Sequence, residues 1–252
     1  MNRLRRSLTS VAALATTTAL AVALTAPPAG AGTDDLAGLW LLNEGSGQVA
    51  TDLSFSGNRG QLGSSPTADP QDPEWVSLPR LLLLKRAALR FNGTQSVRMA
   101  DAPSLEPDGV TVLARVRSTG PGAFRYVMSK GAFQCENASY GLYTGESGGL
   151  RFYVSDGTQV HLSADAGAGL WDGAWHTVRG SFDGQQLRLS VDGAQVGTPM
   201  PAAVSVYYGM PTGDDFYLGD YVGPCASPLG FAGDIDAAAV IGHYDTDTSL
   251  PQ

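Results

Sequence analysis

Alternation of apolar and polar residues with a period of two is the feature that most constrains the fold of this chain. Three segments show it clearly, and their apolar members are Val110, Val112, Ala114 and Val116; Leu150, Phe152 and Val154; and Leu187, Leu189 and Val191. Turn dipeptides separate such segments, namely Asn92-Gly93, Asp156-Gly157, Asp183-Gly184 and Asp192-Gly193. These dipeptides supply the positive φ angles that tight hairpins need. The pattern predicts an all-β fold of antiparallel strands, each with one buried face.

The composition supports a folded chain and excludes two classes of protein. Hydrophobic residues make up 43% of the 252 residues, which is enough for a sizeable core and excludes wholesale disorder. Acidic residues number 24 against 16 basic ones, which argues against a nucleic-acid-binding protein, because such a protein needs a basic surface. The sequence contains no long amphipathic helix and no repeat of about 20–50 residues, so it favours a sandwich over a propeller or solenoid.

Two stretches depart from the alternation. The proline-rich segment 64–79 has the composition of a long surface connection. The apolar run from Leu81 to Leu84 suits a buried strand, and it is too short to cross a bilayer.

The beginning of the chain has the layout of a secretory signal peptide. Three arginines come first, residues 7–26 carry no charge, and a small-x-small cleavage site ends at Ala31. A membrane anchor is the alternative, but a spanning helix needs about 20 strongly apolar residues, and threonines interrupt this stretch. The paired arginines also leave a twin-arginine export route open. We therefore expect a signal peptide at 1–31, a mature domain at 32–252 and a secreted protein.

Two cysteines, Cys135 and Cys225, lie in the expected mature domain. In an oxidising compartment an even number of cysteines suggests a disulfide, and only one pairing exists. Both cysteines lie in polar segments that contain Gly or Pro between strand-like runs. We therefore expect a disulfide that joins two loops, with two free buried thiols as the alternative.

Six short motifs follow one another in a specific order. They are LWLLNEGSG at 39–47, SGNRG at 56–60, ALRFNG at 88–93, DGAWHTV at 172–178, FDG at 182–184 together with LSVDG at 189–193, and FAGDID at 231–236. In this order they resemble the motifs of LamG-like jelly-roll domains, which belong to the concanavalin A-like lectin/glucanase superfamily. The resemblance spans about residues 36–242. It implies an antiparallel two-sheet jelly-roll sandwich and ligand binding as the usual activity.

The sequence lacks the catalytic patterns that we sought. A retaining glycosidase needs two carboxylates about 5 Å apart, and the glucanases of the superfamily carry them as Glu-x-Asp-x-x-Glu, which does not occur here. His176 has neither a nucleophile elbow nor a Cys-His pairing beside it. There is also no zinc-binding spacing and no phosphate-binding loop. We expect a non-catalytic protein, with a divergent polysaccharide hydrolase or lyase as an alternative.

Calcium is the metal that the resemblance implies. Many superfamily members hold a structural calcium with an Asp near the C-terminal strand and carbonyl groups near the N-terminus. Asp236 lies at the similar position, and Asp52 or carbonyls near Asn43 and Gly60 could complete a shell of about six to eight oxygens. The alternative is that Asp236 caps or hydrogen-bonds a turn.

Tyrosines near the two cysteines form the predicted ligand site. Sugar sites stack pyranose faces on aromatic rings and surround them with polar groups. Tyr140 and Tyr143 follow the first cysteine, and Tyr217 and Tyr221 precede the second, so a disulfide would bring both pairs to one rim. Half-buried strand positions are the alternative for each of them. We expect carbohydrate binding at this rim, or else a protein-interaction or adhesion module. In either case we expect the partner to be an extracellular glycan or a surface protein, and not a nucleic acid. We also expect no membrane span after cleavage and a monomeric protein.

Overall fold

The computed structural model describes residues 36–81, 84–132, 137–209, 213–222 and 228–242. They all belong to one of the two units into which the chain divides, Thr33–Gln252. The expected signal peptide and both cysteines, Cys135 and Cys225, lie outside the described residues, so secretion and the disulfide stay predictions. Within the described ranges, no helix has the length and apolar character that crossing a membrane requires.

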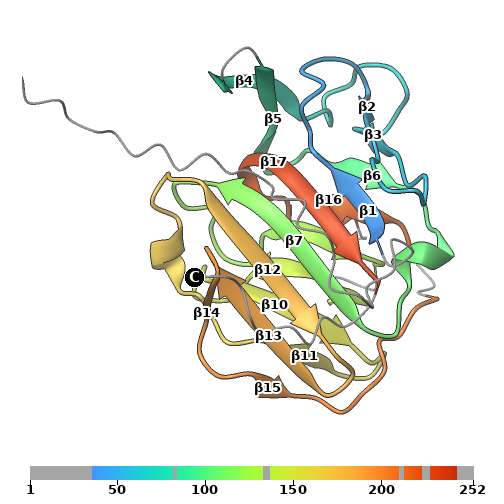
Figure 1. Ribbon diagram of the computed structural model, residues 1–252, viewed down its shortest axis with the longest axis vertical. Coiled ribbons are helices and arrows are strands. Elements are labelled where there is room, and N and C mark those ends of the chain that lie inside the picture. The colour runs from blue at the N-terminus through green and yellow to red at the C-terminus, as the bar shows by residue number, and fades with distance from the viewer. Residues whose placement is uncertain (1–35, 82–83, 133–136, 210–212, 223–227, 243–252) are drawn as a thin grey trace, which may run out of the picture. The chain divides into compact units, whose positions relative to one another are not determined.

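Two antiparallel sheets form the described part of this unit. Sheet A runs in spatial order through β14 (Ala194–Gln195), β13 (Gln186–Val191), β12 (His176–Phe182), β7 (Val110–Arg117), β17 (Ala232–Ile241), β5 (Leu84–Asn92) and β4 (Glu74–Leu81), with β1 (Leu36–Trp40) on β17 and β15 (Met200–Pro201) on β13. Sheet B runs through β11 (Val160–Leu162), β10 (Leu150–Ser155), β9 (Tyr140–Thr144), β8 (Tyr126–Lys130), β16 (Phe216–Leu218), β6 (Val97–Met99), β3 (Gly60–Leu62) and β2 (Val49–Ala50). Two short 3-10 helices, η2 (Pro103–Leu105) and η3 (Ala168–Leu170), lie in the connections. Figure 1 looks onto sheet A, with β17, β7, β12 and β13 side by side.

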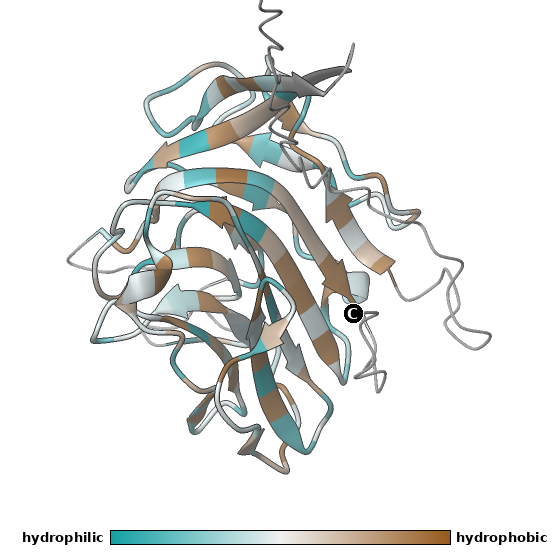
Figure 2. Ribbon diagram, turned by 60° about the vertical axis from the view of Figure 1, so that its left-hand side comes forward, coloured by the Kyte–Doolittle hydropathy of each residue, from teal (hydrophilic) through white to brown (hydrophobic). Residues whose placement is uncertain are grey.

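The main core lies between the two sheets. Trp40 of β1 stacks on Phe216 of β16, with ring centroids 5.6 Å apart. A Cβ atom on Gly180 of β12 would lie only 2.3 Å from the ring of Phe152 on β10, so glycine is needed where the sheets interlock. The predicted alternation appears as bands of opposite hydropathy along the strands (Figure 2). These features confirm the predicted all-β, antiparallel two-sheet jelly-roll sandwich.

Sheet B departs from the one-sided burial that the alternation predicts. Tyr153 alternates with core residues of β10, yet it is fully buried on the opposite face of the sheet. Tyr126, Tyr143 and Tyr221 pack with it in a second apolar group, which we call the tyrosine cluster. The ring of Tyr126 lies 5.4 Å from that of Tyr143 and 4.8 Å from that of Tyr221, centroid to centroid. Strands β8 to β10 are therefore covered on both faces.

One strand lies where the sequence predicts a surface connection. β4 begins at Glu74, inside the segment 64–79, and places Trp75 opposite Leu89 of β5. Pro79 is tolerated within β4 because this is an edge strand of sheet A, where a residue without an N–H group costs no pairing. β4 ends at Leu81 and β5 begins at Leu84, and residues 82 and 83 of the apolar run lie outside the described residues.

Candidate functional site

Arginine and aspartate side chains form a row across the outer face of sheet A. The strand register sets Asp234 of β17 between Arg90 of β5 and Arg117 of β7. Arg90 donates from Nε to Asp234 Oδ1 at 2.8 Å and from Nη2 to Oδ2 at 3.2 Å. Arg117 donates to Oδ2 from Nε at 3.1 Å and also from Nη2. In this first row, one carboxylate fixes two planar guanidinium groups.

A second row lies further along β17. Asp236 accepts a hydrogen bond from Arg86 of β5 at 3.2 Å and another from Arg115 of β7. A bulge between Ile235 and Ala237 shifts the register here, so Asp236 has no direct cross-strand partner in the β7 ladder. Its Oδ1 atom is buried without a hydrogen-bond partner. The second row is therefore less completely paired than the first.

The two aspartates respond differently to burial. Burial raises the pKa of Asp236, and the opposing influence of Arg115 and Arg86 does not restore it. Burial also acts to raise the pKa of Asp234, but hydrogen bonds from Arg90 and Arg117 outweigh it and lower that pKa. Asp234 is therefore a firmly ionised acceptor at neutral pH.

The first row borders an open depression of about 460 Å³. Its lining includes Arg90, Arg117, Asp234, Ser118, Thr119, Gly120, Gly173 and Gly233. Two loops meet there, since the Gly173 amide donates to the Ser118 carbonyl at 2.9 Å. Glycine is required at position 233, because a Cβ atom there would lie 2.5 Å from the Arg117 carbonyl oxygen. The size lies within the range of small-molecule sites, about 300–1,000 Å³.

Trp175 lies beside both rows and is partly exposed. The guanidinium carbons of Arg115 and Arg117 are each 4.7 Å from its ring centroid, within the range of cation–π attraction. Arg117 is thus held by Asp234 and by the indole ring. Both contacts restrict the rotation of its side chain, which prepares the guanidinium for a ligand at no further ordering cost.

His176, the next residue, has a structural environment. Its Nδ1 lies 2.7 Å from Asp192 and its Nε2 lies 3.1 Å from Asp172. Burial acts to lower the pKa of His176, but hydrogen bonds to Asp192 and Asp172 outweigh it and raise that pKa. Both ring nitrogens are engaged, so the imidazole is poorly placed to act as a general base.

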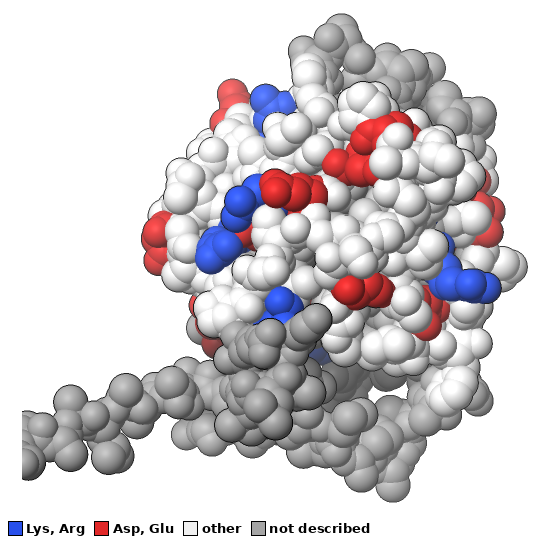
Figure 3. Space-filling view, turned by 90° about the horizontal axis from the view of Figure 1, so that it is seen from above, with Lys and Arg blue, Asp and Glu red and all other residues white. Residues whose placement is uncertain are grey.

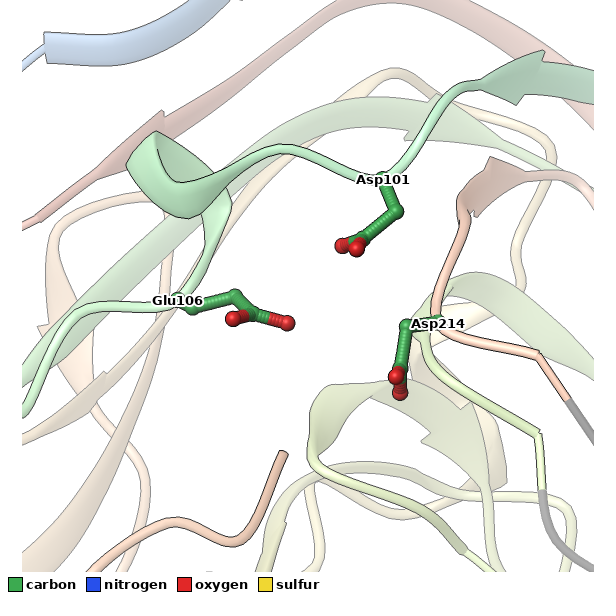
Figure 4. Close-up of side chains that lie close together, drawn as sticks. All are labelled: Asp101, Glu106 and Asp214. Atoms are coloured by element: carbon green, nitrogen blue, oxygen red, sulfur yellow. The ribbon is translucent and has the colours of Figure 1, made fainter. Parts of the chain in front are cut away.

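Three acidic side chains, Asp101, Glu106 and Asp214, point toward a common centre (Figure 4). None of them lines the depression. The ammonium group of Lys130 binds at their common centre. Lys130 Nζ donates to Asp101 Oδ1 at 2.7 Å, to Glu106 Oε1 at 2.9 Å and to the Asp214 carbonyl. We call this group the lysine cage. In this cage the ammonium group of Lys130 supplies the positive charge that the acidic groups face.

The predicted calcium ligands do not fit a calcium site. Asp52 already accepts from the amides of Leu39, Ser54 and Asn58 and from the Ser54 hydroxyl, over both of its oxygens. Asp236 faces two guanidinium groups, whose charge opposes a divalent cation. Donors thus engage both oxygens of Asp52, and two guanidinium groups neutralise Asp236 through its Oδ2 atom.

The four predicted tyrosines do not form one open rim. Tyr143 and Tyr221 do come together in the tyrosine cluster, but they are only 7% and 3% exposed. Tyr140 is fully buried in the main core, and its hydroxyl donates to the Leu105 carbonyl at 2.9 Å. Tyr217 of β16 is partly exposed. The prediction of a surface platform is therefore wrong for Tyr140. The rings of Tyr143 and Tyr221 both pack against the ring of Tyr126 instead of facing solvent.

Sequence reasoning missed the residues of the first row. Arg90 and Asp234 both lie inside recognised motifs, ALRFNG and FAGDID, and Arg117 ends an alternating segment. Their shared signal is a charged residue on the polar side of a predicted strand. That signal becomes informative only when the strand register is known.

A family model matches more than half of the chain, residues 91–246. It is Laminin_G_3, described as Concanavalin A-like lectin/glucanases superfamily. The chain belongs to this superfamily. The predicted resemblance is thereby confirmed, and Arg117, Lys130 and Asp234 all lie within the matched region of the superfamily model. No curated protein matches the sequence.

Solved structures share the superfamily fold at low sequence identity. Domain 4 of AbnA, a GH43 extracellular arabinanase from Geobacillus stearothermophilus, in complex with arabinotriose, is 14% identical, with a TM-score of 0.59 over 84% of this chain and 94% of that domain. Trypanosoma rangeli sialidase in complex with the inhibitor DANA is 14% identical, with a TM-score of 0.54 over 83% of this chain. The match covers only 31% of the sialidase chain. These similarities establish a common fold.

Proposed function

We propose that this protein is a non-catalytic carbohydrate-binding protein whose ligand lies in the depression beside the first row. The observation that carries the proposal is the fixed orientation of Arg90 and Arg117 at the edge of an open hollow. Domain 4 of the arabinanase, which has the same fold, was solved in complex with arabinotriose. The expected signal peptide supports an extracellular glycan as the ligand.

The lining of the depression has the chemistry that a sugar needs. The guanidinium groups and the exposed Thr119 hydroxyl offer hydrogen bonds to sugar oxygens. Glycines 120 and 173 have no side chains, so a ligand can approach the backbone closely there. A rigid, polar and open hollow of this kind suits one or two units of a longer polysaccharide.

The same lining argues against hydrolysis. Among the described residues around the depression, Asp234 is the single carboxylate. Glycoside hydrolysis by the usual route needs two carboxyl groups, one of them protonated. Asp234 is held ionised by two arginines, so it serves poorly as a general acid.

A tryptophan placed in the depression tests the proposed site. Thr119→Trp fills the hollow and leaves every charged contact intact, whereas Thr198→Trp places the same bulk at an exposed position in the β14–β15 connection. Binding is measured by affinity electrophoresis against a panel of neutral and acidic soluble polysaccharides. We expect the wild type and Thr198→Trp to be retarded by the same polysaccharide and Thr119→Trp to migrate freely.

Two outcomes contradict the proposal. Equal retardation of both variants would remove the depression as the site. A wild-type protein that binds no polysaccharide in the panel would favour the alternative of a protein-interaction or adhesion module.

A further inference from the structure

We infer that the glycan bound in this depression is acidic, and that a uronic acid carboxylate pairs with Arg90 and Arg117. The inference rests on the proposed function and narrows its ligand class. Its basis is the arrangement of charge in the first row, where the cations and the anion differ in exposure and in number.

Charged groups are sparse on this molecule. Figure 3 shows small basic and acidic groups close together on a mostly uncharged surface, in keeping with a chain of which 16% is charged and whose net charge is −8. The two rows have a positive charge balance although the whole chain is acidic, because they contain four arginines and two aspartates. A local excess of positive charge on an acidic protein concentrates anions and not cations.

Exposure adds to this excess. The side chains of Asp234 and Asp236 are each only 6% exposed, whereas those of Arg90 and Arg117 are 50% and 33% exposed. The carboxylates therefore lie beneath the guanidinium groups. A ligand in the depression meets the cations first.

The first row leaves hydrogen-bond donors unused. Arg90 and Arg117 direct their Nε and Nη2 groups to Asp234, and the Nη1 group of each makes no hydrogen bond to the described residues. Both side chains line the same depression. One aspartate between two arginines leaves one positive charge without a partner, which is the complement of one carboxylate.

Glu74 is the nearest competitor for this charge. It lies opposite Arg90 in the β4–β5 register and attracts that guanidinium electrostatically. Glu74 does not line the depression, and among the described residues Arg117 donates hydrogen bonds to Asp234 alone. The charge inside the hollow is therefore still available to a ligand.

Carboxylates are better partners than sugar hydroxyls for such donors. Hydrogen bonds between ionised partners are about twice as strong as neutral ones, and the planar guanidinium matches a carboxylate in geometry. A neutral sugar would accept hydrogen bonds here but would leave the positive charge uncompensated. The depression should thus discriminate between an acidic polysaccharide and its neutral counterpart.

The first experiment varies the ligand. The full-length protein is titrated with polygalacturonate and alginate, and with the carboxyl-reduced form of each polymer, at constant ionic strength. We expect at least one acidic polymer to bind about tenfold or more tightly than its own reduced form, since a hydrogen bond to a charged group is worth about that factor. Dextran sulfate is included as a polyanion without carboxylates, and we expect it to bind more weakly.

The outcomes separate this inference from the proposed function. Equal affinity for acidic and reduced polymers would overturn the inference and leave carbohydrate binding intact. Equal affinity for dextran sulfate would also overturn it, because general attraction to polyanions would then explain the result. Absence of binding to every polysaccharide would contradict the proposed function itself.

The second experiment varies the protein. In Arg90→Gln the carboxylate of Asp234 keeps its ion pair with Arg117, so we expect the fold to be preserved. The matched control is Arg151→Gln, which removes an arginine from an Arg–Asp pair on sheet B, where Arg151 lies 3.2 Å from Asp165. We expect Arg90→Gln to lose about tenfold in affinity for the acidic polymer and little for the reduced one, with Arg151→Gln unchanged. Unchanged selectivity in Arg90→Gln, with an unchanged melting temperature, would overturn the inference.

Discussion

The first row and the lysine cage are both clusters of opposite charges, but they bury opposite partners. In the first row the carboxylate of Asp234 is 6% exposed and the arginines above it are 33% and 50% exposed. In the lysine cage Lys130 is fully buried, while Asp101 and Glu106 are 49% and 27% exposed. In each cluster the buried partner, Asp234 or Lys130, holds its neighbours in place. In the first row the more exposed partners are the two arginines, which a ligand can reach.

The cage shows what a structural cation looks like in this fold. Lys130 points from β8 into the sandwich and ties together the η2 connection and the segment before β16. Its ammonium donates to three oxygens, so no donor is left over. The first row differs on this point, since the Nη1 groups of Arg90 and Arg117 make no hydrogen bond to the described residues.

The largest expected effect is on stability, at the cage. Lys130→Met removes the buried cation and leaves two carboxylates and a carbonyl without their donor. We expect a loss of about 3 kcal/mol in the free energy of unfolding, in the range for breaking a buried ion pair, measured by urea denaturation. Arg86→Gln is the comparison, because the Arg86 side chain is 38% exposed and Asp236 keeps Arg115; we expect a loss of about 1 kcal/mol or less. Equal losses would end the distinction between the two kinds of cluster.

A smaller effect is expected for Asp234→Asn, which removes the charge that orients both arginines. The pKa of Asp234 is lowered in the folded state, so its stabilising contribution is present above its unfolded pKa of about 3.8 and disappears as pH falls through the folded value. We expect a loss of about 2 kcal/mol at pH 7 that shrinks as the pH falls below about 3.8. Denaturation at a series of pH values checks this. A difference from wild type that stays constant down to pH 2 would show that the charge does not matter.

His176 gives a third, still smaller effect with the opposite pH dependence. Its pKa is raised by Asp192 and Asp172 against the effect of burial, so its contribution is fully present below the unfolded pKa of about 6.5 and is lost as pH rises through the folded value. We expect His176→Gln to lower the melting temperature by about 2 °C at pH 5.5 and by less at pH 8.5. An equal shift at both pH values would contradict this account of the imidazole.

No effect is expected from calcium. The cage already contains a cation, and Asp52 and Asp236 are engaged by hydrogen-bond donors. The melting temperature of the wild type should be the same in excess calcium and in EGTA. A melting temperature that is several degrees higher in calcium would show that the protein binds calcium, as the sequence predicts. The ligands would then have to include groups other than Asp52 and Asp236.

Local patterns predicted the fold well because strand alternation is a local property. The inward residues of β7 are buried, as expected from their spacing, and the outward residues Leu113, Arg115 and Arg117 are partly exposed. Thr111 is the exception, because it is on the outward side and is still buried. Tyr153 shows the limit of this reasoning. Its burial depends on partners from β8, from β9 and from the segment after β16, and the spacing within β10 cannot reveal them.

The candidate site was beyond the reach of the sequence for a similar reason. Arg90 and Asp234 are separated by 144 residues and meet only because β5 pairs with β17 in one particular register. The bulge before Ala237 then decides that Asp236 is paired less completely than Asp234. The tyrosine prediction relied on a disulfide whose cysteines lie outside the described residues, and the burial of Tyr140, Tyr143 and Tyr221 comes from packing between strands, which local sequence does not reveal.

The most direct test of the central claim is to observe the arginine side chains during binding. We would record the backbone amide resonances and the arginine Nε and Nη resonances of the 15N-labelled protein by NMR while adding trigalacturonate, and again with its carboxyl-reduced form. The account predicts that trigalacturonate shifts the signals of Arg90 and Arg117, that Arg151 is unaffected, and that the reduced sugar has little effect. Shifts confined to Tyr143, Tyr221 and their neighbours, with Arg90 and Arg117 unmoved, would contradict it.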